Sequence, residues 1–434
     1  MEFYATDHAA ILRILLAKDN RHDAYAVRRS CHELSRLLLQ NLAVRKKMVE
    51  VGLVPTMREI VSLHIESSVD VLVDCCHFLR RMISLKGTSG PVIDPVDSRY
   101  LKICEEPTEL DIQTKITEAG FLGMFMSGLG RYPDHSGLFE EVCRLISLLC
   151  FDMPSQPHVE NQSDIASTGF LRLLCEGLAA GRFGEHETQC ATDALTALLY
   201  ENASNVGDAV EELDMLTVIS HVFAKFHSVP HIVENLSRSL FHIVTLIPET
   251  RESLIELRLI ERLLDFLETY RPDHGDALVQ WHVLKLLEMA SRRHEATKDD
   301  ICRCQGPIIL VTMLQRPRFI SLPARLNEHP LHLIALLLFG NLAVTRDGTT
   351  EGSPDVAPGR VDQLMRADAH QYAVQILRTT SGGPTPLLEQ ATRLLEILAQ
   401  IGGFRLLTTH PTWTNQLRDP SLGFGPSPAL CPPI

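Results

Sequence analysis

Apolar side chains recur along most of this chain at spacings of three and four residues, a pattern that predicts amphipathic helices. Leu34, Leu37, Leu38 and Leu42 show this spacing clearly. The long helices that the pattern predicts cover residues 27–44, 69–85, 138–151, 187–203, 231–247, 277–293, 329–344 and 386–401. Because one helix pair cannot bury such a face alone, we expect neighbouring helices to stack around a continuous core.

A second phrase recurs between these helices, in which a glycine precedes an apolar pair that begins a new helix. The positions that align with this glycine are Gly52, Gly120, Gly169, Asp214, Arg258 and Gly306. They lie 68, 49, 45, 44 and 48 residues apart. A period in the mid-forties is typical of units of two or three helices in armadillo and HEAT repeats. We expect the glycine to permit a sharp turn between the long helices of neighbouring units, because it lacks a Cβ atom.

The segment NLAVRKKMVEVGLVPTMREIV at 41–61 resembles the armadillo signature, in which an Asn-Leu-Ala helix end is followed by a linker and a Gly-apolar-x-Pro helix start. Related helix ends are LLYENASN at 198–205 and LLFGNLAV at 337–344. The resemblance extends over about residues 10–405. It implies an all-α fold, a right-handed α-solenoid of about seven to eight armadillo-like repeats.

Composition divides the chain into a repeat domain and a tail. We expect an armadillo-like helical domain over residues 1–405, with inserted loops at about 86–111, 317–330 and 345–359. These loops are rich in Pro, Gly or polar residues, which favour turns over helices. The C-terminal tail, 406–434, is rich in Pro and Gly and is expected to be disordered at its end.

The resemblance also suggests where a partner would bind. In armadillo proteins the helix with Asn-Leu-Ala lines the concave groove, and its Asn bonds the backbone of an extended peptide. The residues that match this Asn are Asn41, Asn202 and Asn341. An Asn near a helix end can instead cap the helix, and the sequence leaves both roles open. Importin-type proteins carry Trp four residues earlier, where this chain has Leu37, Leu198 and Leu337, so a nuclear-import receptor is disfavoured.

Five further residues are candidates for the groove. Trp281 and Glu288 lie on one of the predicted groove helices, where Trp281 is either a contact for a partner or part of the core. Arg36, Arg80 and Arg81 belong to a basic stretch of the first two repeats. This stretch could dock an acidic partner, or it could be an ordinary solvated helix face.

Charge and cysteine content narrow the functional classes. The net charge is −13, with a balance of +3 in residues 1–60 and −16 in the remainder, which disfavours nucleic-acid binding. The eleven Cys have no regular framework, and several lie in apolar helical stretches, so we expect free thiols in a reducing compartment. The N-terminal segment does not resemble a signal peptide, and no apolar stretch is long enough to span a membrane. We therefore expect a cytoplasmic protein, or one shared between cytoplasm and nucleus.

The sequence lacks the common motifs of catalysis and nucleotide binding, including the Walker loop, G-x-G-x-x-G after a strand and G-x-S-x-G. Cys302 and Cys304, with His294 upstream, lack the second pair that a structural zinc site needs. We expect no enzyme activity, cofactor or metal. The leading hypothesis is a scaffold or adaptor that holds a partner peptide or helix in the groove. The alternative is an enzyme regulator, either a small-GTPase dissociation stimulator or a cochaperone. The segment 333–344 resembles the repeats of armadillo-like proteins that regulate small GTPases.

Overall fold

The computed structural model describes residues 17–40, 48–83, 112–153, 156–270, 278–316, 330–345, 356–379 and 385–402. Asn41, the loop 86–111 and the tail 406–434 lie outside the described residues. The same holds for nearly all of the loop 317–330 and for most of the loop 345–359.

The chain divides into two compact units, Met1–Leu257 and Arg258–Ile434. The first unit contains η1 (Lys18–His22), α2 (Ala24–Gln40), α4 (Leu53–His64), α5 (Val69–Ile83), α7 (Ile112–Glu118), α8 (Phe121–Arg131), α9 (Ser136–Leu149), α10 (Val159–Ser167), α11 (Phe170–Ala179), α12 (Glu185–Leu199), α13 (Ala203–Glu211), α14 (Met215–Phe226), α15 (Pro230–Leu246), η2 (Pro248–Thr250) and α16 (Arg251–Glu256). A short antiparallel ribbon of β1 (Phe151–Met153) and β2 (Gln156–Pro157) follows α9. The second unit contains α17 (Leu259–Thr269), α18 (Leu278–Ser291), α19 (Glu295–Arg303), α20 (Gly306–Leu314), α22 (Pro330–Ala343), α23 (Pro358–Arg366), α24 (Ala369–Thr379) and α25 (Pro386–Gly402). Among the helices described, none is long and apolar enough to cross a membrane.

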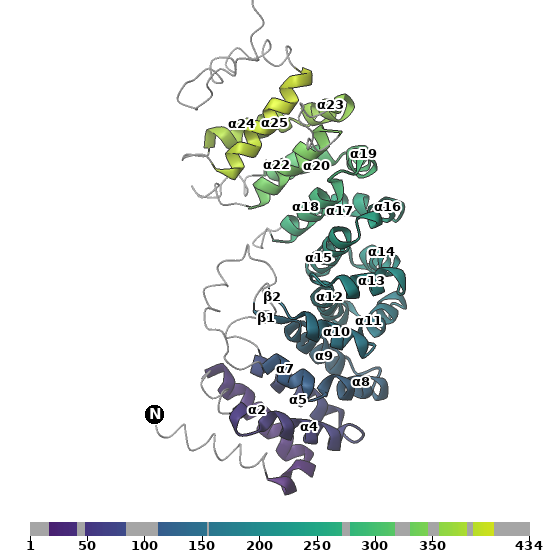
Figure 1. The fold of residues 1–434 in the computed structure, drawn as a ribbon, viewed down its shortest axis with the longest axis vertical. Coiled ribbons are helices and arrows are strands. Elements are labelled where there is room, and N and C mark those ends of the chain that lie inside the picture. Colours follow the sequence, from purple (N-terminus) through teal and green to yellow (C-terminus); the bar gives the residue numbers. More distant parts are fainter. Residues whose placement is uncertain are drawn as a thin grey trace, which may run out of the picture. The chain divides into compact units, whose positions relative to one another are not determined.

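The helices repeat in threes, as in α10–α11–α12 and α13–α14–α15 of the first unit and α23–α24–α25 of the second. The third helix of each repeat packs against the third helix of the next: α2, α5, α9, α12 and α15 follow one another in this way, and so do α18, α22 and α25 (Figure 1). These eight are the long helices predicted from the apolar pattern, and their described ends lie within four residues of the predicted ones. The fold is therefore an all-α solenoid, as predicted. We call the surface formed by α2, α5, α9, α12 and α15 the third-helix face.

The recurring glycine position forms a left-handed corner between the first and second helix of a repeat. The corner residues and their φ angles are Gly52 (79°), Gly120 (78°), Gly169 (86°), Asp214 (45°), Arg258 (54°), Gln305 (59°) and Asp368 (61°). Two expectations are corrected here. The corner joins helices within one repeat rather than the long helices of neighbouring repeats, and Gln305 takes the left-handed position because Gly306 is already the first residue of α20. Glycine suits the corner because L-residues with a Cβ atom are strained at positive φ.

The centre of the first unit shows why the third helices must stack. In α12 the side chains of Ala191, Ala194, Leu195 and Leu198, spaced three and four residues apart, are all fully buried. They pack between the neighbouring third helices α9 and α15. Burial of apolar surface stabilises by about 25 cal/mol per Å², so packing against these two neighbours stabilises α12.

Two glycines near the start of α8 allow a test that separates the strain of a positive φ from steric crowding of an added Cβ atom. Neither Gly120 nor Gly123 of α8 has an atom within 4 Å of the position that an added Cβ would take, but only Gly120 has a positive φ. We expect Gly120→Ala to lower the free energy of unfolding by about 1–2 kcal/mol through strain at the left-handed corner. The matched variant Gly123→Ala should raise it by about 0.5–1 kcal/mol, since alanine favours the helix interior.

Chemical denaturation of both variants measures the two effects. Equal changes of the same sign in the two variants would show that the left-handed corner does not decide the choice of glycine.

Candidate functional site

Ion pairs cross the third-helix face of the first unit from one helix to the next. At the junction of α2 and α5, Nε of Arg28 donates to Asp74 at 2.7 Å, and Nη1 of the same guanidinium donates to Asp70 at 2.8 Å. His32 lies 3.3 Å from the other oxygen of Asp74. Hydrogen bonding to Asp74 raises the pKa of Arg28, although burial opposes the shift. The basic stretch seen in the sequence is therefore compensated here by carboxylates from the next repeat.

The junction of α5 and α9 repeats this arrangement around a buried carboxylate. Nε of Arg80 donates to Glu141 at 2.8 Å, and Nδ1 of His77 lies 3.4 Å from the same oxygen. Burial raises the pKa of Glu141, but its contacts with His77 and Arg80 outweigh burial and lower the pKa to about 2. Glu141 is therefore ionised throughout the neutral range and holds the two helices together.

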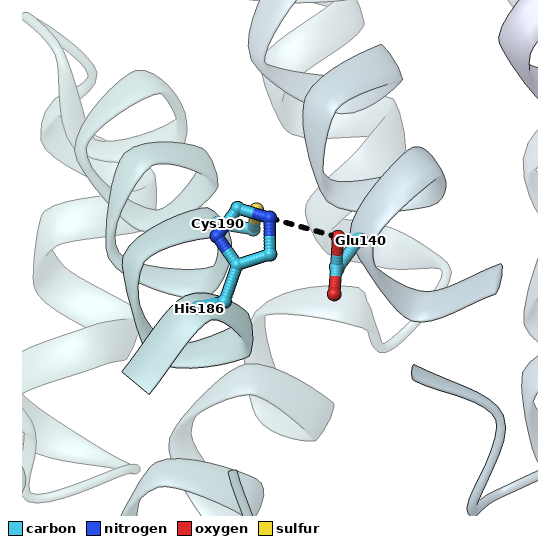
Figure 2. Close-up of side chains that lie close together, drawn as sticks. All are labelled: Glu140, His186 and Cys190. Carbon is cyan, nitrogen blue, oxygen red and sulfur yellow. Dashed lines mark ion pairs between the residues drawn. The ribbon is translucent and has the colours of Figure 1, made fainter. Parts of the chain in front are cut away.

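At the junction of α9 and α12, Arg144 takes the central place. Its Nη1 donates to Glu141 at 3.0 Å, while Nη2 lies 3.3 Å from Glu140 and 2.8 Å from Nε2 of His186. The same nitrogen of His186 is 3.1 Å from Glu140 (Figure 2). Glu140 and Arg144 thus continue the ion pairs of the previous junction toward α12.

The junction of α12 and α15 is mostly uncharged. Oγ1 of Thr196 lies 2.9 Å from the backbone oxygen of Asn235 and 2.9 Å from Oγ of Ser239. Burial raises the pKa of Asp193, and this effect is only partly offset by Arg238 and a hydrogen bond from Ser147. The charged pattern therefore weakens toward α15.

We call the residues that connect α2, α5, α9 and α12 the polar row. They are Arg28, His32, Asp70, Asp74, His77, Arg80, Glu140, Glu141, Arg144 and His186. The carboxylates of Asp74 and Glu141 are only 10% and 11% exposed, whereas the side chains of His32 and His186 are 66% and 59% exposed. The row thus sets Asp74, Glu140 and Glu141 at its base and the accessible imidazoles of His32 and His186 above them, whereas Asp70 is itself exposed.

The three arginines singled out from the sequence fall in different environments. Arg80 is part of the polar row. Arg81 is half-buried, and its Nε donates to His77 at 3.4 Å. Burial and the neighbouring Arg80 lower the pKa of Arg81. Arg36 is exposed and pairs with Glu33 of its own helix at 3.2 Å, so the structure places it apart from the row.

Asn202 is a capping residue in the interior. It is 2% exposed and lies just before α13, where its side chain accepts a hydrogen bond from the backbone nitrogen of Asn205 at 3.0 Å. Its Nδ2 donates to Gln162 at 3.2 Å. The groove role is therefore wrong for Asn202, because no partner can reach a side chain buried in this way. The capping alternative holds, but the helix that it caps is the one that follows.

Asn341, Glu288 and Trp281 belong to the second unit. Nδ2 of half-buried Asn341 donates to the carboxylate of Glu288 at 3.2 Å and thereby connects α22 with α18. Glu288 is 3% exposed and also accepts from Arg292 at 2.7 Å. Trp281 is 7% exposed, with the ammonium of Lys285 4.7 Å from its ring centre. The burial of Trp281 agrees with the core alternative, and a groove role for Asn341 stays a prediction.

Sequence reasoning missed most of the polar row and the group of Glu140, His186 and Cys190. Partners that cross a junction come from neighbouring repeats, as with Arg28 and Asp74, 46 residues apart, and with Arg80 and Glu141, 61 residues apart. Complementary charges one period apart would have revealed the first of these junctions but not the second. The motif that the sequence did single out is different: His294 caps α19 and Cys302 is buried.

Comparison with known proteins places the fold. No known family model matches the chain, and no curated protein matches it. An engineered protein solved by the Northeast Structural Genomics Consortium has a similar structure, with a TM-score of 0.59 and 15% sequence identity. The match covers 96% of this chain and 97% of the engineered protein. Two designed armadillo repeat proteins, one in complex with the peptide (KR)4, each match 64% of this chain over 99% of their own, with TM-scores of 0.48 and 15% identity. The repeats of three helices, in which each third helix packs against the next, are themselves what gives the chain an armadillo-like repeat fold.

The buried cap makes a prediction about stability. We expect Asn202→Ala to lower the free energy of unfolding by about 2 kcal/mol, because it removes an N-cap and a hydrogen bond to buried Gln162. Asn341→Ala should cost less than about 1 kcal/mol, since Glu288 keeps its pair with Arg292. Chemical denaturation tests both, and hydrogen exchange at the α13 amides should rise in Asn202→Ala alone. If Asn202→Ala leaves the free energy of unfolding unchanged, Asn202 does not stabilise the protein as a cap.

The depressed pKa of Glu141 predicts acid sensitivity in the first unit. A carboxyl whose folded pKa lies below its ordinary value of 4.5 contributes stability above that pH. This contribution is lost as the pH falls from 4.5 toward about 2. Its full size is at most about 3 kcal/mol, from the conversion of pKa units into free energy. Denaturation between these pH values should show a flatter pH dependence in Glu141→Gln; an unchanged slope would contradict the assignment.

Proposed function

We propose that this chain is a non-catalytic scaffold that binds an extended peptide or a helix of a protein partner on its third-helix face. The observation that carries the proposal is the polar row. It runs across four consecutive third helices and keeps solvent-accessible imidazoles above buried carboxylates. A surface that only needed to be soluble would not require ion pairs aligned from one repeat to the next.

The spacing of the row suits an extended chain. Packed helices lie about 8–10 Å apart, and an extended peptide rises about 3.3 Å per residue. About three residues of such a peptide would therefore cross each third helix. Arginine offers five donors and a carboxylate about four acceptor positions, so the paired groups of the row keep capacity for the amides of a partner.

The ion pairs also lower the cost of binding. Arg80 and Glu141 are already fixed by each other and by packing, since their side chains are 12% and 11% exposed. Side chains that are ordered before binding lose little conformational entropy when the partner arrives. The buried layer therefore orients the accessible layer of His32 and His186 for recognition.

The balance of charge indicates the kind of partner. The row contains three arginines, Arg28, Arg80 and Arg144, and four acidic residues, Asp70, Asp74, Glu140 and Glu141. A nearly balanced surface gives little long-range attraction for a run of one charge. We therefore expect a partner segment of mixed polar sequence rather than an acidic or basic tail.

Site-specific crosslinking tests the location. A photoreactive residue in place of His32 or His186 should capture the partner from cells. The same residue in place of Arg172, which is exposed on the second helix α11, should not. Capture from Arg172 with equal efficiency would show that the partner does not use the third-helix face.

Binding measurements with the captured partner complete the test. The double variant His32→Ala/His186→Ala should weaken binding at least about tenfold, which corresponds to about 1.4 kcal/mol. Arg172→Ala is the matched control and should leave the affinity unchanged. Unaltered binding of the double variant would contradict the proposal.

The alternative, a regulator of a small GTPase, makes a different prediction. A dissociation stimulator must bind the nucleotide-free GTPase more tightly than the loaded forms, because a ligand shifts an equilibrium only through differential affinity. If the captured partner is a GTPase, pull-downs with its nucleotide-free, GDP-loaded and GTP-loaded forms separate the two functions. Indifference to the nucleotide supports the scaffold.

A further inference from the structure

We propose that Glu140, His186 and Cys190 form a binding site for a divalent zinc-like metal ion at the junction of α9 and α12. The three residues each offer one ligand atom, and these atoms all lie within 4.8 Å of one another. Figure 2 shows the imidazole of His186 facing the carboxylate of Glu140, with Cys190 on the same helix as His186. The site shares Glu140 and His186 with the polar row, but the inference rests on the three ligand atoms and not on the binding of a protein partner.

Two of the ligands are positioned by helix geometry alone. His186 and Cys190 are four residues apart on α12, so their side chains lie on the same face, one turn apart. Glu140 comes from α9, which packs directly against α12. A metal held by all three would connect neighbouring repeats.

The donor set suits zinc. Imidazole nitrogen, thiolate sulfur and carboxylate oxygen are the three ligand types that Zn²⁺ takes in proteins, and three protein ligands leave a fourth position for water. The site is also accessible from solvent. Cys190 is only 6% exposed, but the side chain of His186 is 59% exposed. A hydrated ion can therefore enter from solvent and exchange its waters for the three ligands.

A single cationic donor connects two of the proposed ligands. Nε2 of His186 lies 2.8 Å from Nη2 of Arg144 and 3.1 Å from the carboxylate of Glu140. Arginine can only donate, so a favourable contact with Arg144 requires a lone pair on this nitrogen. The same Nη2 donates to Glu140 at 3.3 Å, so Nε2 and the carboxylate are two acceptors that share one positive group.

A divalent cation can replace this shared donor. It accepts the lone pair of Nε2 and an oxygen of Glu140 at once, as the guanidinium of Arg144 does through hydrogen bonds. On metal binding Arg144 can withdraw to Glu141, to which its Nη1 already donates at 3.0 Å.

Cys190 completes the site by losing a proton. Binding breaks the S–H bond, forms a sulfur–metal bond and releases one proton to solvent, as in other cysteine-ligated metal sites. The step involves no oxidation or reduction.

Cobalt(II) is the probe, because thiolate ligation gives it a charge-transfer absorption that carboxylates and histidines do not produce. We expect the full chain to bind one equivalent with this band, and Zn²⁺ to displace it. Cys190→Ser should abolish the band, and His186→Ala should weaken cobalt binding at least about tenfold, since even residues behind the ligands cost 10–100-fold. Cys304→Ser is the matched control, because Cys304 is a partly accessible cysteine elsewhere in the fold, and it should leave the band intact.

Arg144→Gln distinguishes a true site from opportunistic thiol binding. Removal of the competing guanidinium should tighten cobalt binding several-fold, whereas a role of Arg144 in merely supporting the fold predicts no change or weaker binding. His186 is exposed, so its variant should fold, and circular dichroism confirms the helix content of each variant. A band that survives Cys190→Ser, or an Arg144→Gln variant that binds no more tightly, would overturn the proposal.

Discussion

The sharing of apolar surface between successive third helices is the constraint on which the remaining structure depends. A helix such as α12 is buried against α9 and α15 at once, so both neighbours stabilise it. The edge of each third helix that this packing leaves toward solvent is narrow. Polar residues concentrate there, and one period brings each of them beside its counterpart on the next helix. Stacking therefore explains where on the third helices the polar row lies.

Ionisable groups near this core must be paired, because an unpaired charge is expensive to bury. The first unit satisfies this requirement across helix junctions, with Arg80 against Glu141. The second unit contains a more deeply buried case. Lys298 is fully buried, and its ammonium donates to Glu295 at 2.8 Å and to the backbone oxygen of Val344 at 2.9 Å. Arg360 donates to the same carbonyl at 3.0 Å, so two cations provide hydrogen bonds to the backbone oxygen that follows α22.

Local sequence pattern predicted the helices well, because apolar spacing directly reports which face of a helix is buried. It could not predict how helix ends are satisfied. The phrase around Asn202 resembles the one around Asn341, yet α12 ends at Leu199 and Asn202 caps the next helix, whereas Asn341 lies within α22. Asn202 also donates a hydrogen bond to Gln162, 40 residues away, which no local pattern contains. The group around His186 escaped prediction for the same reason, since Glu140 comes from another repeat.

The left-handed corner bears on how such chains can be recognised at all. Asp214, Arg258, Gln305 and Asp368 adopt the same backbone conformation as the glycines of the earlier repeats. Each substitution costs only about 1–2 kcal/mol, a loss that a long stack with a large shared core can absorb. Another residue can therefore take the place of the glycine in the repeat while the left-handed corner is kept. The backbone of the repeat is therefore more regular than its residues, and the fold can be recognised although no family model and no curated protein matches the sequence.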